Sequence, residues 1–165
     1  MRRLHLIAVG VMLLSMTPAI AHQQRKQDGN DVSQNFDIDS VLFKHTGQRV
    51  IVRISTYDTW PATSVRRGRE VGIRLWTRGE RYNGHHVRAY HQNGRWKGEI
   101  IHFCEGQTCV ERVGNARVKK LDARTLRVSF RRSKVQGYRG WIRWYVTNPN
   151  SRDSVPNNGS FWHGF

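Results

Sequence analysis

Apolar and polar positions alternate with a period of two in a series of short segments that begins near residue 36. Successive side chains of a β-strand point to opposite faces of its sheet, so this pattern predicts half-buried strands. Short turns rich in Gly and Asn separate the segments, and the 3.6-residue period of an amphipathic helix is not apparent between them. The predicted strands cover residues 36–39, 50–57, 71–77, 87–91, 96–103, 126–131 and 141–146.

Two turn signals fix the pairing of neighbouring strands. Asn93-Gly94 is the strongest two-residue hairpin signal, because both residues tolerate the positive φ that such a turn needs. Residues 46–48 form a second turn, centred on Gly47. Several short strands joined by turns, without helices between them, predict an all-β fold. We expect an antiparallel β-sandwich, with a small Greek-key barrel as the alternative.

The N-terminus has the features of a cleavable signal peptide. Arg2 and Arg3 precede a short apolar run over 6–16, and small residues lead up to Ala21. The apolar run is too short to cross a bilayer as a helix. We therefore predict cleavage after Ala21 and a secreted protein, extracellular or associated with the cell envelope, without a transmembrane segment.

The remaining chain divides into a leader and a folded part. Residues 22–35 are almost entirely polar, which predicts a flexible leader. Residues 36–165 have the length of one ordinary hydrophobic core, which predicts a single β-sandwich domain.

Both cysteines lie close together, at Cys104 and Cys109. Outside the cytosol two neighbouring cysteines normally pair, so we predict a disulfide that closes a small hairpin loop. The alternative, a zinc site that also uses His102, is one ligand short of the usual four.

The chain is strongly basic. It has 28 Lys and Arg against 12 Asp and Glu, a formal net charge of +16, of which the predicted signal peptide removes two. Such a charge attracts polyanions, including nucleic acid, acidic glycans and anionic envelope polymers.

Strand alternation places Arg and aromatic residues on positions that face away from the core. Aromatic rings stack on sugars or bases, and guanidinium groups match phosphate or carboxylate. Cross-strand pairs of Arg and aromatic residues also stabilise a sheet without any ligand. The same alternation buries Ile142, Trp144 and Val146, and it leaves Trp76, Tyr90, Trp141 and Tyr145 at least partly exposed to solvent. The candidate ligand-binding residues are Arg53, Tyr57, Arg74, Trp76, Arg88, Tyr90, Trp141, Arg143 and Tyr145.

The pattern favours binding over catalysis. His85 and His86 are adjacent, so in a strand they point to opposite faces, and we expect surface histidines rather than a site. His91 is expected to pair near Trp96 across the hairpin. The carboxylates of residues 37 and 39 would share one face about 6.6 Å apart, a glycosidase-like spacing, although charge at a sheet edge explains them more simply. We predict no catalytic residue, metal ligand or cofactor.

Several segments resemble a loosely defined group of uncharacterised secreted bacterial β-sandwich proteins. These are residues 55–60 (STYDTW), 126–134 (LRVSFRRSK) with 138–141 (YRGW), and 152–159 (RDSVPNNG). The resemblance implies the fold and export, and it implies no activity. Members of the group often carry an Asp-rich hairpin where this chain has the basic segment 78–84, so a cation-binding role there is not expected.

Charge and outward aromatic residues together favour an extracellular, non-enzymatic module that binds an anionic or carbohydrate polymer of the cell envelope. Three alternatives remain: a single-stranded nucleic-acid binding protein, a small secreted hydrolase, and a structural or interaction protein without a small ligand. The sequence does not indicate an oligomeric state.

Overall fold

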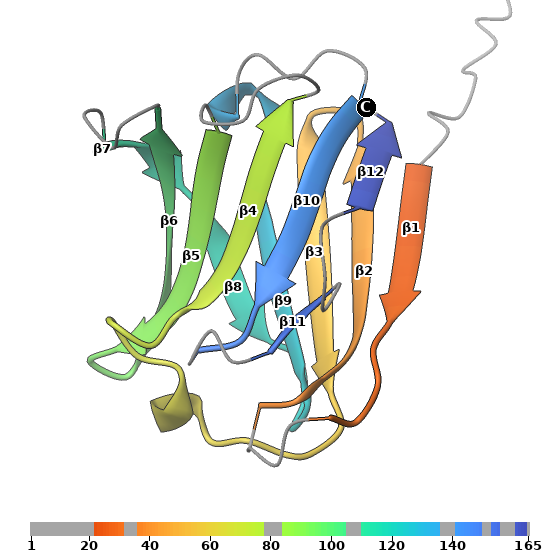
Figure 1. Ribbon diagram of the computed structural model, residues 1–165. Helices are drawn as coiled ribbons and strands as arrows, with labels where there is room; N and C mark the ends of the chain where they lie inside the picture. The colour runs from red at the N-terminus through yellow and green to blue at the C-terminus, as the bar shows by residue number, and fades with distance from the viewer. Residues whose placement is uncertain are drawn as a thin grey trace, which may run out of the picture.

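The computed structural model is an all-β structure of two antiparallel sheets, as the alternation predicts (Figure 1). The predicted sandwich is therefore confirmed, and the described strands do not close into the alternative barrel. The structure describes residues 22–31, 36–77, 84–104, 110–135, 141–149, 153–155 and 161–164. The predicted signal peptide, residues 1–21, lies outside them. No described helix is long and apolar enough to cross a membrane.

One sheet has five strands in the order β1-β2-β3-β9-β8. Its strands are β1 (His22–Gln27), β2 (Ile38–Thr46), β3 (Arg49–Thr56), β8 (Arg117–Lys120) and β9 (Thr125–Arg131). Two short 3-10 helices, Ala62–Ser64 and Arg132–Lys134, lie in the connections.

The other sheet has seven strands, six of them in the order β11-β10-β4-β5-β6-β7, and β12 also pairs with β10. Its strands are β4 (Val71–Thr77), β5 (Gly84–Gln92), β6 (Arg95–Phe103), β7 (Val110–Asn115), β10 (Trp141–Thr147), β11 (Ser154–Val155) and β12 (Phe161–Gly164).

The core lies between the sheets and follows the alternation. Ile142, Trp144 and Val146 of β10 are fully buried, as predicted. Trp144 stacks on Phe43 of the opposite sheet, with ring centroids 5.1 Å apart. A slip of one residue would carry Arg143 into this core, so the burial of its neighbours fixes the register of β10.

The hairpin predicted at residues 93–94 is confirmed. Gln92 of β5 pairs with Arg95 of β6, which leaves a loop of two residues. Asn93 and Gly94 have φ angles of 51° and 73° there, the positive values that a tight hairpin turn needs. The same hairpin sets His91 opposite Trp96, as expected.

Part of the predicted flexible leader is a strand. Residues 22–27 form β1, which pairs with β2 at the edge of the five-stranded sheet, so the prediction is wrong for this segment. Residues 32–35 lie outside the described residues. The sequence of β1 shows no alternation of apolar residues, because this strand places polar side chains at the edge of the core. Gln24 of β1 accepts a hydrogen bond of 3.1 Å from the indole nitrogen of Trp144.

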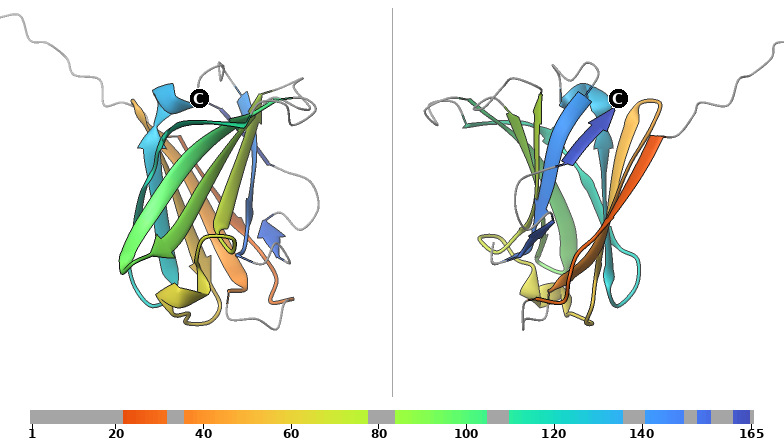
Figure 2. Two further views of the ribbon diagram at one scale, coloured as in Figure 1. Left: turned by 90° about the vertical axis from the view of Figure 1, so that its left-hand side faces the viewer. Right: turned by 45° about the vertical axis from the view of Figure 1, so that its right-hand side comes forward.

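The chain passes from one sheet to the other between β7 and β8 (Figure 2). β7 pairs with β6, and β8 pairs with β9. At the corner, the amide of Ala116 donates to the carbonyl of Gly98 at 3.1 Å. A Cβ on Gly98 would lie 2.6 Å from the Ala116 carbonyl oxygen, so this close approach requires glycine. The corner leaves part of β6 without a neighbouring strand and shapes the hollow described below.

Candidate ligand-binding site

The outer face of the seven-stranded sheet carries Arg and aromatic side chains in rows that cross the strands. Trp162 of β12 pairs with Arg143 of β10, and Arg143 pairs with Trp76 of β4. In the next row Tyr145 of β10 pairs with Arg74 of β4. Neighbouring strands lie about 4.8 Å apart, so each guanidinium group has an aromatic neighbour on the next strand.

The side chains of these rows contact one another. The rings of Trp76 and Tyr145 have centroids 5.1 Å apart. The guanidinium carbon of Arg143 lies 6.0 Å from the centre of the Trp76 ring, and that of Arg74 lies 5.8 Å from the centre of Tyr145. These distances are those of cation–π pairs. Rings and cations therefore alternate on this face and hold one another in place.

The face remains accessible to solvent. Trp162 is 41% exposed, which is unusual for the largest side chain. Arg74 and Arg143 are exposed, while Trp76 and Tyr145 are half-buried. We call these five residues the Arg–aromatic face. Its rings are ordered by neighbours and still reach the surface, which is the arrangement that a stacking platform needs.

A glycine extends the aromatic row across β5. The rings of Trp76 and Phe103, on β4 and β6, meet edge to face with centroids 6.1 Å apart. Gly84 of β5 lies between their strands. A Cβ at Gly84 would lie 2.8 Å from the Phe103 ring and 2.9 Å from the Trp76 ring. The missing side chain therefore allows the two rings to meet above β5.

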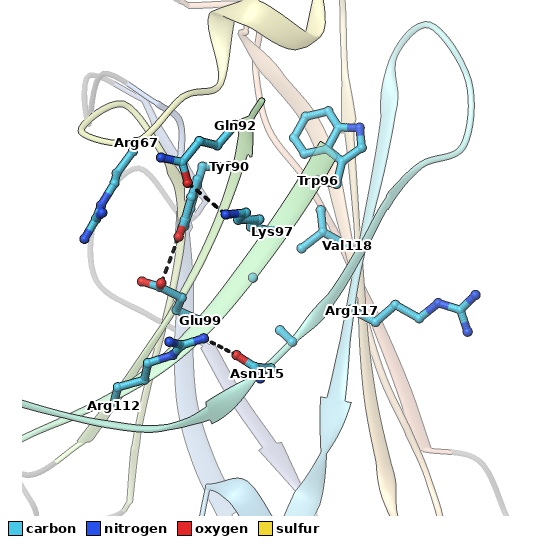
Figure 3. A pocket seen from close by; sticks show the side chains of 12 residues that line it. Arg67, Tyr90, Gln92, Trp96, Lys97, Glu99, Arg112, Asn115, Arg117 and Val118 are labelled. Atoms are coloured by element: carbon cyan, nitrogen blue, oxygen red, sulfur yellow. Dashed lines mark hydrogen bonds between the residues drawn. The ribbon is translucent and has the colours of Figure 1, made fainter. Parts of the chain in front are cut away.

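A hollow of about 460 Å³ lies where β7 leaves β6, beside the β5–β6 hairpin (Figure 3). Four of its lining residues, Arg67, Lys97, Arg112 and Arg117, are cations, against the single carboxylate of Glu99. The hollow is therefore positively charged and suits an anionic group.

Hydrogen bonds order the wall of the hollow. The Tyr90 hydroxyl donates to Glu99 at 2.8 Å, and the Lys97 ammonium donates to Gln92 at 3.1 Å (Figure 3). Tyr90 is only 3% exposed, so the prediction that its ring is exposed is wrong. Alternation gives the face to which a side chain points, whereas its depth depends on neighbours, here Lys97 opposite it and Glu99 on the diagonal.

His86 lies between the Arg–aromatic face and the hollow. Burial, together with the nearby charges of Arg74 and Arg88, lowers its pKa to about 3. The Arg88 side chain donates to His86 Nδ1 at 3.4 Å and forms an ion pair with Glu70 at 3.6 Å. His86 is therefore neutral at ordinary pH and acts as an acceptor for Arg88.

Eight of the nine predicted ligand-binding residues have described side chains, and these lie on two different surfaces. Arg53 belongs to β3 of the five-stranded sheet, and Tyr57 immediately follows that strand, where its hydroxyl donates to the Asp28 carbonyl at 2.5 Å. They are not part of the Arg–aromatic face, because alternation does not say which strands share a sheet. The backbone of Trp141 pairs with Gly164, and its side chain lies outside the described ones. The predicted residues on the outer face of the seven-stranded sheet are Arg74, Trp76, Arg88, Tyr90, Arg143 and Tyr145.

Sequence reasoning missed two members of the aromatic rows, Phe103 and Trp162. Phe103 ends a predicted strand, and continued alternation would have placed it outward. Trp162 belongs to the segment FWHG, whose alternation is too short to distinguish from an irregular tail.

The catalytic candidates do not assemble a site. Asp37 is 1% exposed, so the explanation as charge at a sheet edge is wrong for this residue. His85 is buried and packs against His102 across β5 and β6, with the two rings tilted and their centroids 5.0 Å apart. The expectation of a surface histidine is therefore wrong for His85, whose pKa is lowered to about 4 by burial and by His102.

Cys104 follows β6 and is not a free thiol. Its predicted partner, Cys109, lies outside the described residues, so the Cys104–Cys109 disulfide stays a prediction.

No match was found when the chain was compared with protein-family models, curated proteins and solved structures. The resemblance to secreted bacterial β-sandwich proteins therefore stays a prediction, and the proposals below are based on the geometry of the site.

Proposed function

We propose that this protein is an extracellular, non-enzymatic binding module whose Arg–aromatic face binds an anionic polysaccharide of the cell envelope. The observation that carries the proposal is the row Trp162–Arg143–Trp76, with Tyr145 and Arg74 in the row beside it. The predicted signal peptide supports the extracellular location.

The side chains of this row are chemically complementary to a polymer of acidic sugars. Trp162 and Trp76 are two strands apart, about 9.6 Å at the usual strand spacing, a distance comparable with a disaccharide unit. Each ring offers an apolar surface for a sugar ring. Arg143 lies between them, where its guanidinium fork suits a carboxylate, sulfate or phosphate group. A polymer with a charged group on alternate sugars would match this order.

Nearby carboxylates do not cancel the positive charge of the region. Glu70 is paired with Arg88, and Glu99 is the single carboxylate among the residues that line the hollow. The hollow adds four further cations at the end of the same sheet. A chain that crosses the Arg–aromatic face can therefore place its next anionic groups there.

Single-stranded nucleic acid is the second candidate, because stacked rings beside Arg also favour bases and phosphates. Base–aromatic stacking contributes about 1–3 kcal/mol per base, so a preference for bases would exceed what charge alone gives. The predicted export of the protein favours the polysaccharide.

Isothermal titration with three polymers tests the proposal: a polyuronate, neutral dextran and single-stranded oligothymidylate, each over a salt series. We expect binding of the polyuronate, no binding of dextran, and weaker binding of the oligonucleotide at equal charge. Trp76→Ala and Arg143→Ala should each weaken polyuronate binding about tenfold or more. Arg53→Ala, which removes one exposed Arg from the other sheet, is the matched control and should change affinity less than twofold.

Two results would contradict the proposal. Equal losses for Arg143→Ala and Arg53→Ala would show attraction by net charge without a site. Tighter binding of the oligonucleotide than of the polyuronate would favour the second candidate.

A further inference from the structure

Three carboxylates meet at one end of the sandwich, outside the Arg–aromatic face. Asp28 and Asp31 follow β1, and Asp153 immediately precedes β11. One carboxylate oxygen from each lies within 4.8 Å of the others. The segments come from different sheets, so the cluster is built by the fold and not by a local acidic run.

The cluster contains buried oxygens that have no hydrogen-bond donor. Asp153 is 3% exposed. Its Oδ2 accepts the amide of Ile38 at 2.7 Å. Its Oδ1 and the Oδ2 of Asp28 are buried and receive no hydrogen bond from an N–H or hydroxyl group of the described residues, and the two carboxyl groups contact each other. A buried carboxylate oxygen without a partner is costly, and a second carboxylate beside it increases the cost. A bound cation would satisfy both.

Asp28 and Asp153 interact directly through their carboxyl groups, which affects the protonation of both. The pKa of Asp153 is raised to about 6, first by burial and then by neighbouring Asp28 and Asp31. The pKa of Asp28 is also raised, with burial as its largest cause.

We propose that Asp28, Asp31 and Asp153 bind a Ca²⁺ ion. The donors are carboxylate oxygens only, which hard divalent cations prefer. Ca²⁺ binds oxygen at 2.3–2.6 Å, so opposite ligands lie up to about 5 Å apart, and oxygens that all lie within 4.8 Å of one another satisfy this limit. Mg²⁺ demands a tighter, near-ideal octahedron with ligands up to about 4.2 Å apart. Carboxylates from separate loops fit the more tolerant ion.

The ion would join the two sheets. The amide of Asp28 donates to the Asp39 carbonyl at 2.8 Å, which ties the segment after β1 to β2. The backbone amide of Asn148, which follows β10, donates a hydrogen bond to the Asp153 carbonyl at 2.9 Å. Both backbone segments are thus held by their own sheets before any ion binds. Ca²⁺ would link them and would leave the Arg–aromatic face untouched, so this inference does not depend on the proposed function.

Calorimetric titration of chelator-treated full-length protein with CaCl₂ tests the proposal. We expect one Ca²⁺ per chain with a Kd of about 10⁻⁴–10⁻³ M, the range of extracellular modules. At 10 mM Ca²⁺ the Tm should rise by about 4–8 °C over this range of Kd, since only the folded state holds the site. Tb³⁺ should bind in place of Ca²⁺ and luminesce on excitation of Tyr57, whose hydroxyl contacts the Asp28 carbonyl.

Asp153→Asn should lower Ca²⁺ affinity at least tenfold, and Asp28→Asn should do the same. In chelator both variants should unfold at a higher temperature than the wild type, because each removes one of the like charges that meet in the cluster; this also shows that they fold. Asp58→Asn removes an exposed carboxylate outside the cluster and is the matched control, with unchanged affinity.

The proposal is overturned if the wild type gives neither a Ca²⁺ binding isotherm up to 10 mM nor Tyr57-sensitised Tb³⁺ luminescence. It is also overturned if Asp153→Asn binds Ca²⁺ as the wild type does. Tighter binding of Mg²⁺ than of Ca²⁺ would contradict the choice of ion.

Discussion

The two outer faces of the sandwich are both basic, yet they differ in the side chains that lie beside the cationic residues. On the five-stranded sheet one row runs Arg25, Leu42, Arg53, Arg127 and Lys119 across the strands. On the seven-stranded sheet the corresponding cations alternate with Trp162, Trp76 and Tyr145.

The two faces therefore differ in whether neighbouring side chains stabilise or destabilise their Arg residues. Arg53 lies directly opposite Arg127, an arrangement that destabilises a sheet. Arg143 lies opposite two Trp residues, so its guanidinium group has ring partners. Net charge alone therefore attracts polyanions to either face, and only the Arg–aromatic face adds stacking. The predictions below test that distinction, beginning with the largest expected effect.

The first prediction compares the two sides of the seven-stranded sheet. Trp144→Ala should lower the free energy of unfolding by about 3–5 kcal/mol, because Trp144 is fully buried against Phe43. Trp76→Ala should cost about 1 kcal/mol, mainly its ring contacts with Tyr145 and Phe103. Urea unfolding of the two variants measures this. Equal losses would make Trp76 a packing residue and would remove the main support for a ligand-binding face.

The second prediction concerns acid stability and His86. Because its folded pKa of about 3 is below the unfolded value of 6.5, the unfolded chain binds more protons between these values. His86 therefore lowers stability as the pH falls below about 6.5, by up to about 3 kcal/mol at pH 4. His86→Gln should lose less stability than the wild type between pH 7 and pH 4, in denaturant unfolding at each pH. An identical loss in both proteins would show that His86 is protonated freely in the fold.

The third prediction concerns the glycine between the two rings. Gly84→Ala should cost about 1–3 kcal/mol, because its Cβ would lie 2.5 Å from the Leu75 carbonyl oxygen and press on both rings. Gly114→Ala is the control, since its Cβ would meet only the flexible Lys134 side chain, at 3.1 Å. Thermal unfolding of both variants gives the comparison. If Gly84→Ala is as mild as Gly114→Ala, the aromatic row does not depend on Gly84.

The fourth prediction, the smallest, separates the Arg residues of the two faces. Arg53→Ala should raise the free energy of unfolding by about 0.3 kcal/mol, because it relieves repulsion with Arg127. Arg143→Ala should lower it by about 0.5 kcal/mol, because it removes the contact with Trp76. Chemical unfolding at low salt resolves the sign of each change. Changes of the same sign would mean that the rings do not offset the charge of the Arg–aromatic face.

Alternation was sufficient to predict the sandwich because most strands have one face in the core. It gave 71–77 as a strand with the bounds of β4, and it buried Trp144 correctly. The Asn93-Gly94 signal was equally reliable because the turn depends only on local φ values. Alternation failed for β1, because the side chains of this edge strand are polar and show no apolar period.

The site was only partly predictable, because it depends on which strands are neighbours. β10 lies beside β4, far from it in the sequence, and no local pattern reveals that pairing. Arg53 and Arg74 therefore looked equivalent although they belong to different sheets. The Asp28–Asp153 contact was missed for the same reason, since both residues lie in segments expected to be irregular.

The most direct test of the account observes the tryptophan indole N–H signals by ¹H–¹⁵N correlation NMR during titration with a polyuronate. Signals are assigned by single substitutions. We expect those of Trp76 and Trp162 to move with the ligand, while those of the buried Trp60 and Trp144 stay in place. Saturable binding that leaves Trp76 and Trp162 unmoved would contradict the claim that the Arg–aromatic face is the binding site.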